Sequence, residues 1–111
     1  MPEIVIVGSL KAQPGKEDEL GYALADVIDP TQAEEGCLLY AVHQGVDDPT
    51  RFVIIEQWAN QEAFDAHVQS EYMRNLLARA GDLLAEMPDS PTYAPLRPGA
   101  NPKDTLRGAR S

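Results

Sequence analysis

The chain has 111 residues, of which 43% are hydrophobic, and a formal net charge of −9 at neutral pH. This length suits one compact domain, and no stretch approaches the ~20 apolar residues that would span a bilayer. The acidic balance disfavours nucleic acid as a partner, because the few lysines and arginines are scattered among more numerous carboxylates.

Two further features indicate the cytoplasm. Residues 1–3 lack the basic start of a secretory signal. The single cysteine, Cys37, has no partner for an internal disulfide, which fits a reducing compartment. We expect Cys37 to be a small buried hydrophobic residue and not a nucleophile, because no helix N-terminus activates it. We therefore expect a cytoplasmic protein that is not bound to a membrane.

The first strand is predicted over residues 4–12, an apolar run that the turn pair Pro14-Gly15 ends. Its start is apolar on both faces, which is typical of a central strand. A helix is predicted over residues 17–30, with acidic residues in its first turn, where the helix dipole favours them. We expect Pro30 to end this helix.

Two strands follow, over residues 37–44 and 52–58, and the loop between them is short enough for an antiparallel hairpin. Asn60 is a good N-cap for a helix that begins just after it. A break at residues 69–70 divides this helical region, and Ser70 can cap a second segment that runs to Met87.

Residues 92–96 are predicted to form an edge strand, because prolines flank them. The order βαββαβ predicts an α+β, ferredoxin-like sandwich: a four-stranded antiparallel sheet with helices on one face. The other face carries valine, isoleucine and leucine, and pairing two such faces would give a dimeric α+β barrel. We therefore expect a homodimer of one domain over residues 1–97. Residues 98–111 are rich in proline, glycine and charge, so we expect them to be disordered or to form an arm on a neighbouring subunit.

Short motifs occur in a fixed order along this pattern: Gln13-Pro14-Gly15-Lys16, Glu35-Gly36-Cys37-Leu38-Leu39-Tyr40, Asp48-Pro49-Thr50-Arg51-Phe52, Glu56-Gln57-Trp58 and Ala63-Phe64-Asp65-Ala66-His67. With them, residues 3–97 closely resemble the antibiotic biosynthesis monooxygenase family of small dimeric α+β barrels. The resemblance implies the fold described above. It implies less about the substrate, since the family's fold hosts quinol and polyketide oxygenases, haem-degrading enzymes and an isomerase.

The candidate site lies between the helices and the sheet. Glu56 and Trp58 share one strand face, His67 lies on the apolar stripe of its helix, and Tyr72 begins the next stripe. We predict that His67 and Tyr72 are catalytic and that Trp58, Glu56 and Asn60 contact the substrate. A histidine suits the role of general base, because its side chain titrates near neutrality.

Each of these residues also has a purely structural interpretation. His67 fits a core histidine that is bonded to a backbone carbonyl, and Trp58 and Tyr72 fit the core as packing residues. Glu56 fits an ion pair with an arginine or a contact with a partner subunit. Asn60 is a helix cap before it is a substrate contact.

Two functions remain open. The first is a cofactor-independent monooxygenase that oxidises a small phenolic, quinol or polyketide-like aromatic compound with dioxygen, as the resemblance implies. The second is a non-catalytic dimeric barrel that binds a small hydrophobic metabolite. It is favoured by Tyr72, which stands where many family members carry a further histidine. Haem degradation is disfavoured because the first strand lacks the asparagine that haem-degrading relatives use. The histidines and the cysteine show no metal-ligand spacing, so we expect no metal. The resemblance to cofactor-free oxygenases implies that no other cofactor is needed.

Overall fold

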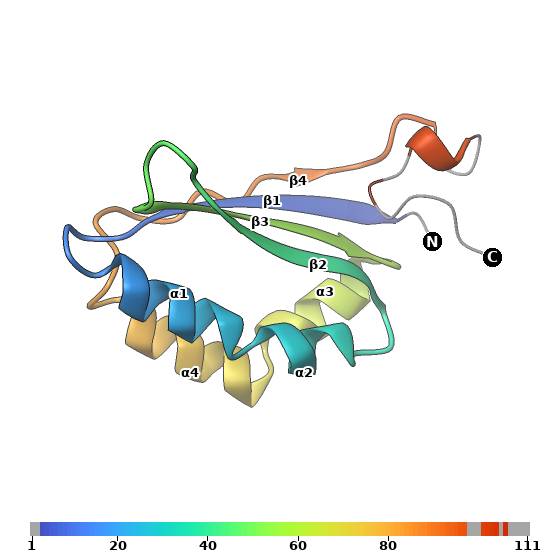
Figure 1. Ribbon diagram of the computed structural model, residues 1–111. Coiled ribbons are helices and arrows are strands. Elements are labelled where there is room, and N and C mark those ends of the chain that lie inside the picture. Colours follow the sequence, from blue (N-terminus) through green and yellow to red (C-terminus); the bar gives the residue numbers. More distant parts are fainter. Residues whose placement is uncertain (1–2, 98–100, 105, 107–111) are drawn as a thin grey trace.

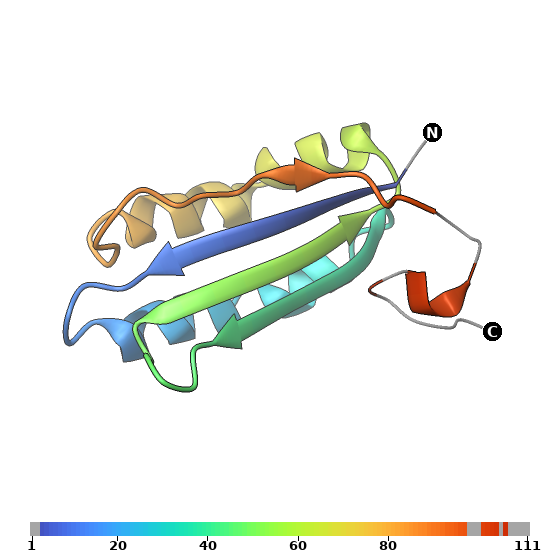
Figure 2. The same ribbon diagram turned by 90° about the horizontal axis from the view of Figure 1, so that it is seen from above.

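In the computed structural model, which describes residues 3–97, 101–104 and 106, a four-stranded antiparallel sheet is covered on one face by four α-helices (Figure 1). The elements in chain order are β1 (Ile4–Lys11), α1 (Glu17–Ala25), α2 (Ile28–Gln32), β2 (Cys37–Gln44), β3 (Arg51–Trp58), α3 (Gln61–Val68), α4 (Glu71–Ala80), β4 (Thr92–Tyr93) and the 3-10 helix η1 (Pro102–Asp104). The strand order is β2-β3-β1-β4, and Figure 2 shows the strands side by side in front of the helices. This arrangement confirms the predicted ferredoxin-like α+β fold.

The centre of the sheet is built by β1 and β3, which pair along their whole length. The hairpin strand β2 pairs with the other side of β3, and an irregularity between Cys37 and Leu39 shifts its register. As a result Tyr40 lies directly opposite Glu56. Residues that are directly opposite in neighbouring strands share a sheet face, so both side chains face the helices.

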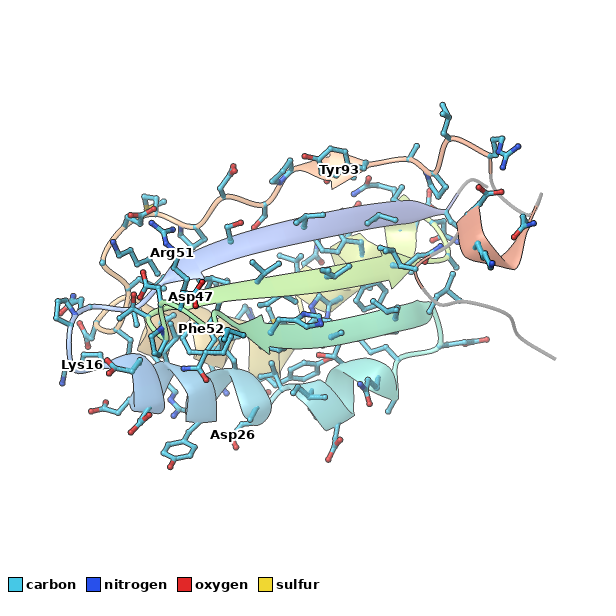
Figure 3. All side chains as sticks on the ribbon, turned by 45° about the horizontal axis from the view of Figure 1, so that its top comes forward. Lys16, Asp26, Asp47, Arg51, Phe52 and Tyr93 are labelled. Atoms are coloured by element: carbon cyan, nitrogen blue, oxygen red, sulfur yellow. The ribbon has the colours of Figure 1, made fainter. Side chains whose placement is uncertain are left out.

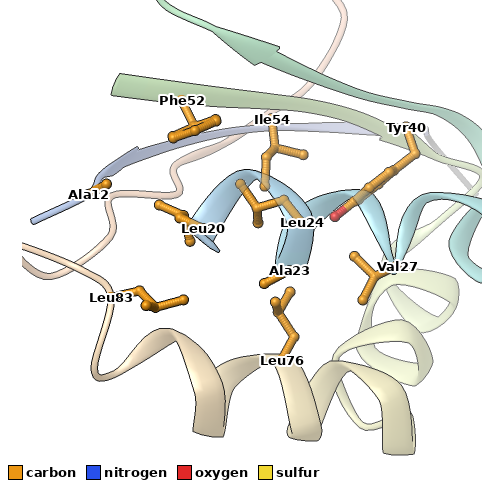
Figure 4. Packing of buried hydrophobic residues seen from close by; sticks show 10 residues of the cluster. All are labelled: Ala12, Leu20, Ala23, Leu24, Val27, Tyr40, Phe52, Ile54, Leu76 and Leu83. Carbon is orange, nitrogen blue, oxygen red and sulfur yellow. The ribbon is translucent and has the colours of Figure 1, made fainter. Parts of the chain in front are cut away.

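The hydrophobic core fills the layer between this face and the helices (Figure 4). Its buried members are Ala12, Leu20, Ala23, Leu24, Val27, Tyr40, Phe52, Ile54, Leu76 and Leu83. Each large aliphatic side chain that is fully buried here, such as Leu24, contributes about 1.5–3 kcal/mol relative to an exposed one. The helix–sheet layer is therefore both the main source of stability and the place where a pocket can form.

The first helical region differs from the prediction. It is divided into α1, which ends at Ala25, and α2, which begins at Ile28, and Pro30 lies inside α2 and does not end it. Pro30 is the third residue of that short helix, where a backbone N–H has no acceptor within the helix. A proline there removes no hydrogen bond, so the chain continues for another half turn before β2.

Two later boundaries were also wrong. Helix α4 ends at Ala80 and not at Met87, because Gly81, a poor helix former, follows it. Leu83 is nevertheless buried, which explains why the apolar spacing continued past the end of the helix. The last strand is Thr92–Tyr93 and not residues 92–96.

The C-terminal prediction is not tested. Residues 98–100, 105 and 107–111 lie outside the described part of the chain, so the expectation of a disordered segment or an arm stays a prediction, as does the domain boundary at residue 97. Within the described residues, Arg97 and Asp104 form an ion pair at 3.0 Å. None of the described helices is long and apolar enough to cross a membrane.

Candidate functional site

Helix α3 holds His67 against the sheet. Asn60 begins the helix as predicted, since its Oδ1 accepts the Ala63 backbone N–H at 2.8 Å. His67 lies in the last turn and is only 1% exposed, which confirms that its ring points inward. The prediction that Ser70 caps the following helix with its side chain is wrong. The Ser70 hydroxyl instead donates to the His67 carbonyl at 2.6 Å and fixes the end of α3.

One ring nitrogen of His67 is bound by a carboxylate that the sequence did not single out. His67 Nδ1 lies 2.8 Å from Glu34 Oε2, and the Tyr72 hydroxyl donates to the same oxygen. Glu34 follows α2, and its backbone is fixed on both sides. Its N–H donates to the Thr31 carbonyl at 3.0 Å, and its carbonyl accepts the Cys37 N–H at 3.1 Å. When Nδ1 carries the proton and donates it to Glu34, the other nitrogen, Nε2, is left as an acceptor.

That second nitrogen faces another buried carboxylate. His67 Nε2 is 3.9 Å from Glu56 Oε1, which also accepts the Trp58 indole N–H at 2.9 Å. Burial raises the pKa of Glu56, although the Trp58 hydrogen bond and His67 act in the opposite direction. Trp58 is fully buried, and its ring centroid lies 4.7 Å from that of His67. His67 therefore lies between two carboxylates, with Trp58 against its ring.

Two further groups near Glu34 keep their protons at neutral pH. Burial raises the pKa of Tyr72, and the hydrogen bond to Glu34 acts in the same direction, so the hydroxyl remains a donor. Burial, with the nearby charges of Glu34 and Glu56, raises the pKa of the Cys37 thiol to about 11. A thiol with that pKa is a poor nucleophile, in line with the structural role expected from the sequence.

The imidazole is enclosed by aromatic rings from the sheet and from its own helix. Tyr40 of β2 is only 4% exposed and meets His67 edge-on, with ring centroids 5.8 Å apart. Phe64, one turn earlier on α3, lies at 6.2 Å. Figure 4 shows Tyr40 extending from β2 toward the helix layer near Leu24. The sequence contained a signal for Tyr40, which ends the Glu-Gly-Cys motif and is an apolar residue on an alternating strand.

A cavity of about 180 Å³ lies against Glu56 and His67. Its walls are mostly aliphatic and aromatic and come from the sheet, from the helices and from the segment that follows α4. They are formed by Ile6, Gly8, Leu10, Leu24, Tyr40, Ile54, Glu56, Phe64, His67, Val68, Met73, Leu76, Leu77, Ala80, Leu84, Pro88 and Ser90. A separate, more open groove of about 340 Å³ runs between α1 and β2 and contains none of the predicted site residues.

The structure brings together most of the predicted site. Glu56 and His67 line the cavity. Trp58 and Tyr72 do not line it: Trp58 donates to Glu56, and Tyr72 donates to Glu34. Asn60 stays apart, with its side-chain oxygen engaged at the helix cap, so its contact with a substrate remains only a prediction. Among the described residues, no group of three or more His, Cys, Asp or Glu side chains is arranged to hold a metal ion.

Several known proteins are similar to this chain. An uncharacterised protein of Synechocystis, sll1783, is 30% identical over 90 residues, and the match covers 81% of this chain but only 61% of that protein. The Mycobacterium tuberculosis protein named "Putative monooxygenase Rv0793" is 28% identical over 84% of this chain and 91% of its own length. Its solved structure superimposes with a TM-score of 0.82 at 26% identity, covering 88% of this chain and 99% of that one.

The fold is also similar to that of PA3566 from Pseudomonas aeruginosa, with a TM-score of 0.83, 27% identity and coverage of 87% of this chain and 97% of that chain. The family model described as antibiotic biosynthesis monooxygenase matches residues 3–79, which form most of the chain and include every predicted site residue. With the βαββαβ sheet and the inward histidine in agreement, the chain belongs to the antibiotic biosynthesis monooxygenase family.

Proposed function

We propose that this protein is a cofactor-independent monooxygenase that oxidises a small phenolic or quinol-like aromatic compound with dioxygen. The observation that carries the proposal is the orientation of His67. Its Nδ1 is bound to Glu34, and its Nε2 lies on the side of Glu56, with which it lines an apolar cavity. A base at the end of an apolar cavity is suited to removing the proton of a bound hydroxyl group.

In the first step, His67 Nε2 accepts the proton of the phenolic O–H. The new N–H bond makes an imidazolium, which the Glu34 carboxylate stabilises from the far side. Glu34 thus acts as an orienting carboxylate: it fixes the tautomer and the ring position of the His67 imidazole. Tyr72 takes part through Glu34, to which its hydroxyl donates, and positions that carboxylate.

In the second step, the phenolate is electron-rich and reduces dioxygen directly, so that the substrate supplies the electrons. A C–O bond forms at the para carbon, and the resulting peroxide takes back a proton from His67. Loss of water then gives a quinone, so that one phenol and one dioxygen become one quinone and one water. The apolar walls keep bulk water from the peroxide.

We also propose that the protein acts as a homodimer. The sheet face without helices carries Val5, Val7, Val53 and Ile55 near its centre, and each is half-buried in the single chain. Figure 3 shows Tyr93 on β4, at the edge of this sheet, and Asp26 in the helix layer on the other side. A water-exposed face of an antiparallel sheet normally carries polar residues, so an apolar face favours a second copy as its cover.

The test is oxygen consumption by the purified, metal-stripped protein with a panel of phenols and hydroquinones, and with the His67→Ala variant beside it. Uptake by the native protein that falls by about 10²-fold or more in His67→Ala supports the proposal. Uptake that is unchanged in a folded His67→Ala variant contradicts the role of His67. No uptake with any member of the panel would favour the alternative, a dimer that binds a hydrophobic metabolite without turnover.

A further inference from the structure

The cavity is small for a ligand site. At about 180 Å³ it is only slightly larger than a cavity of about 150 Å³ lined by Leu, Ile and Phe, which holds one benzene molecule. Sites for drug-sized ligands usually measure about 300–1,000 Å³. The available space therefore fits one aromatic ring with small substituents, whereas three fused rings need a larger cavity.

The walls also lack a positive charge. Among the described residues that line the cavity, none is lysine or arginine, and Glu56 is the only carboxylate among them. Glu34 places a second carboxylate 2.8 Å behind the imidazole. Burial already raises the pKa of Glu56, so a further anion here would meet an unfavourable field without a counter-charge.

A neutral hydroxyl group, by contrast, finds an acceptor. Glu56 Oε1 accepts the Trp58 N–H, and Glu56 lines the cavity together with His67. His67 Nε2 lies 3.9 Å from Oε1, so a hydroxyl that donates to Nε2 would lie beside Glu56. Tyr40 and Ser90 are the other polar side chains of the lining.

We propose that this cavity selects an uncharged phenol of one aromatic ring, whose hydroxyl donates to His67 Nε2 beside Glu56, and that it rejects anionic and three-ring aromatic compounds. The inference rests on the proposed function for the position of the reacting hydroxyl. It narrows the substrate class by size and charge.

The experiment is isothermal titration calorimetry of the full chain under argon, so that binding is measured without oxidation. The ligands are para-cresol, toluene, para-hydroxybenzoate and anthrol. Para-cresol should bind about tenfold tighter than toluene, because toluene lacks the hydrogen-bond donor. It should also bind about tenfold or more tighter than para-hydroxybenzoate, which brings an unpaired carboxylate, and tighter than anthrol. Equal or tighter binding of the carboxylate or of anthrol overturns the proposal, as does failure of the folded protein to bind para-cresol.

Three variants separate the charge and size effects. Glu56→Gln keeps an acceptor for the Trp58 N–H but removes the charge, so the preference for para-cresol over para-hydroxybenzoate should shrink toward equality. Gly8→Ala adds a methyl group 3.4 Å from the Ser90 hydroxyl, and it should weaken para-cresol binding about fivefold or more. Met73→Ala removes a wall side chain and should improve anthrol binding relative to para-cresol by about tenfold. The assignment is contradicted by an unchanged charge preference in Glu56→Gln, by unchanged para-cresol affinity in Gly8→Ala, or by an unchanged size preference in Met73→Ala.

The binding experiment and the oxygen-uptake experiment can fail separately. If the ligands bind in the expected order but no oxygen is consumed in air, the selection rule stands and the oxygenase proposal fails. If oxygen is consumed only with an anionic or three-ring substrate, the oxygenase proposal stands and the selection rule fails.

Discussion

The hydrogen bond from His67 to Glu34 determines which ring nitrogen faces the cavity. Glutamine at position 34 has a similar shape, but it carries no charge to stabilise the imidazolium, and its amide can donate to Nδ1 and reverse the tautomer. We therefore expect Glu34→Gln to lower kcat by about tenfold or more, with a smaller change in KM. Steady-state oxygen uptake measures both quantities.

Tyr72→Phe is the matched control for this change. It removes one donor to Glu34 but leaves the contact between Glu34 and His67 in place, so kcat should fall by less than tenfold. Equal losses in the two variants would show that Tyr72 itself acts on the substrate. No loss in Glu34→Gln would remove Glu34 from the mechanism.

Glu56 should make stability depend on pH. Burial raises its pKa in the folded state above the value in the unfolded chain, so the folded protein binds more protons in the range between the two. The contribution of Glu56 to the free energy of unfolding is fully present below its pKa in the unfolded chain. It is lost as the pH rises through its pKa in the folded protein. Glu56→Gln should therefore gain stability relative to the native protein as the pH rises through and above the range in which a free carboxyl group titrates.

Urea unfolding at several pH values measures this difference. A free energy of unfolding that changes in parallel for Glu56→Gln and the native protein would show that Glu56 is not perturbed in the folded state.

The elements around the site depend on one close contact, between the start of β2 and α3. A Cβ atom on Gly36 would collide with the Cβ of Ala63, and the Gly36 carbonyl accepts the Ala59 N–H at 2.9 Å, so neither segment is free to move away. Gly36→Ala should therefore lower the free energy of unfolding by about 1–3 kcal/mol. Urea unfolding tests this.

Gly21→Ala in α1 is the control for the Gly36 variant. An added methyl group at position 21 would lie 3.8 Å from the Phe52 ring, in ordinary contact, and alanine is the better helix former. This variant should be neutral or more stable than the native protein. If the two alanine variants lose the same stability, the contact between β2 and α3 does not exclude a side chain at position 36.

The elements that the sequence predicted well are those with a strong local signal. The alternating strand Arg51–Trp58 and the helix that Asn60 caps have such signals and lie where we expected them. The helix ends at Ala25 and Ala80 were missed, because apolar spacing continues past each of them and tertiary packing decides where the backbone turns.

The candidate site was predictable only in its inward-facing half. Glu56, Trp58 and His67 follow from strand and helix periodicity. Glu34 does not, because it lies in a loop and meets His67 across 33 positions of sequence. No local pattern indicates such a contact, which depends on the packing of α3 against the end of α2.

At the scale of the whole molecule, the uncovered sheet face should form the dimer. Ile55 lies near its centre, opposite Val7 on one neighbouring strand and Ala41 on the other. Ile55→Lys would place a charge in the buried interface, so we expect it to convert a dimer into a monomer. Size-exclusion chromatography with light scattering measures the mass.

Val46→Lys is the control for surface charge, because Val46 is 96% exposed in the hairpin loop. It should leave the mass unchanged. A native protein that is monomeric at micromolar concentration, or an Ile55→Lys variant that stays dimeric, would show that this face is not the interface.

The most direct test of the oxygenase proposal uses isotopically labelled dioxygen. The metal-stripped protein is incubated with a one-ring phenol that has a free para position, and the quinone is reduced at once to prevent exchange with water before mass spectrometry. The mechanism predicts one labelled oxygen atom in the organic product and the other in water, with labelling that needs His67. A product without label, or label that appears equally with His67→Ala, would contradict it.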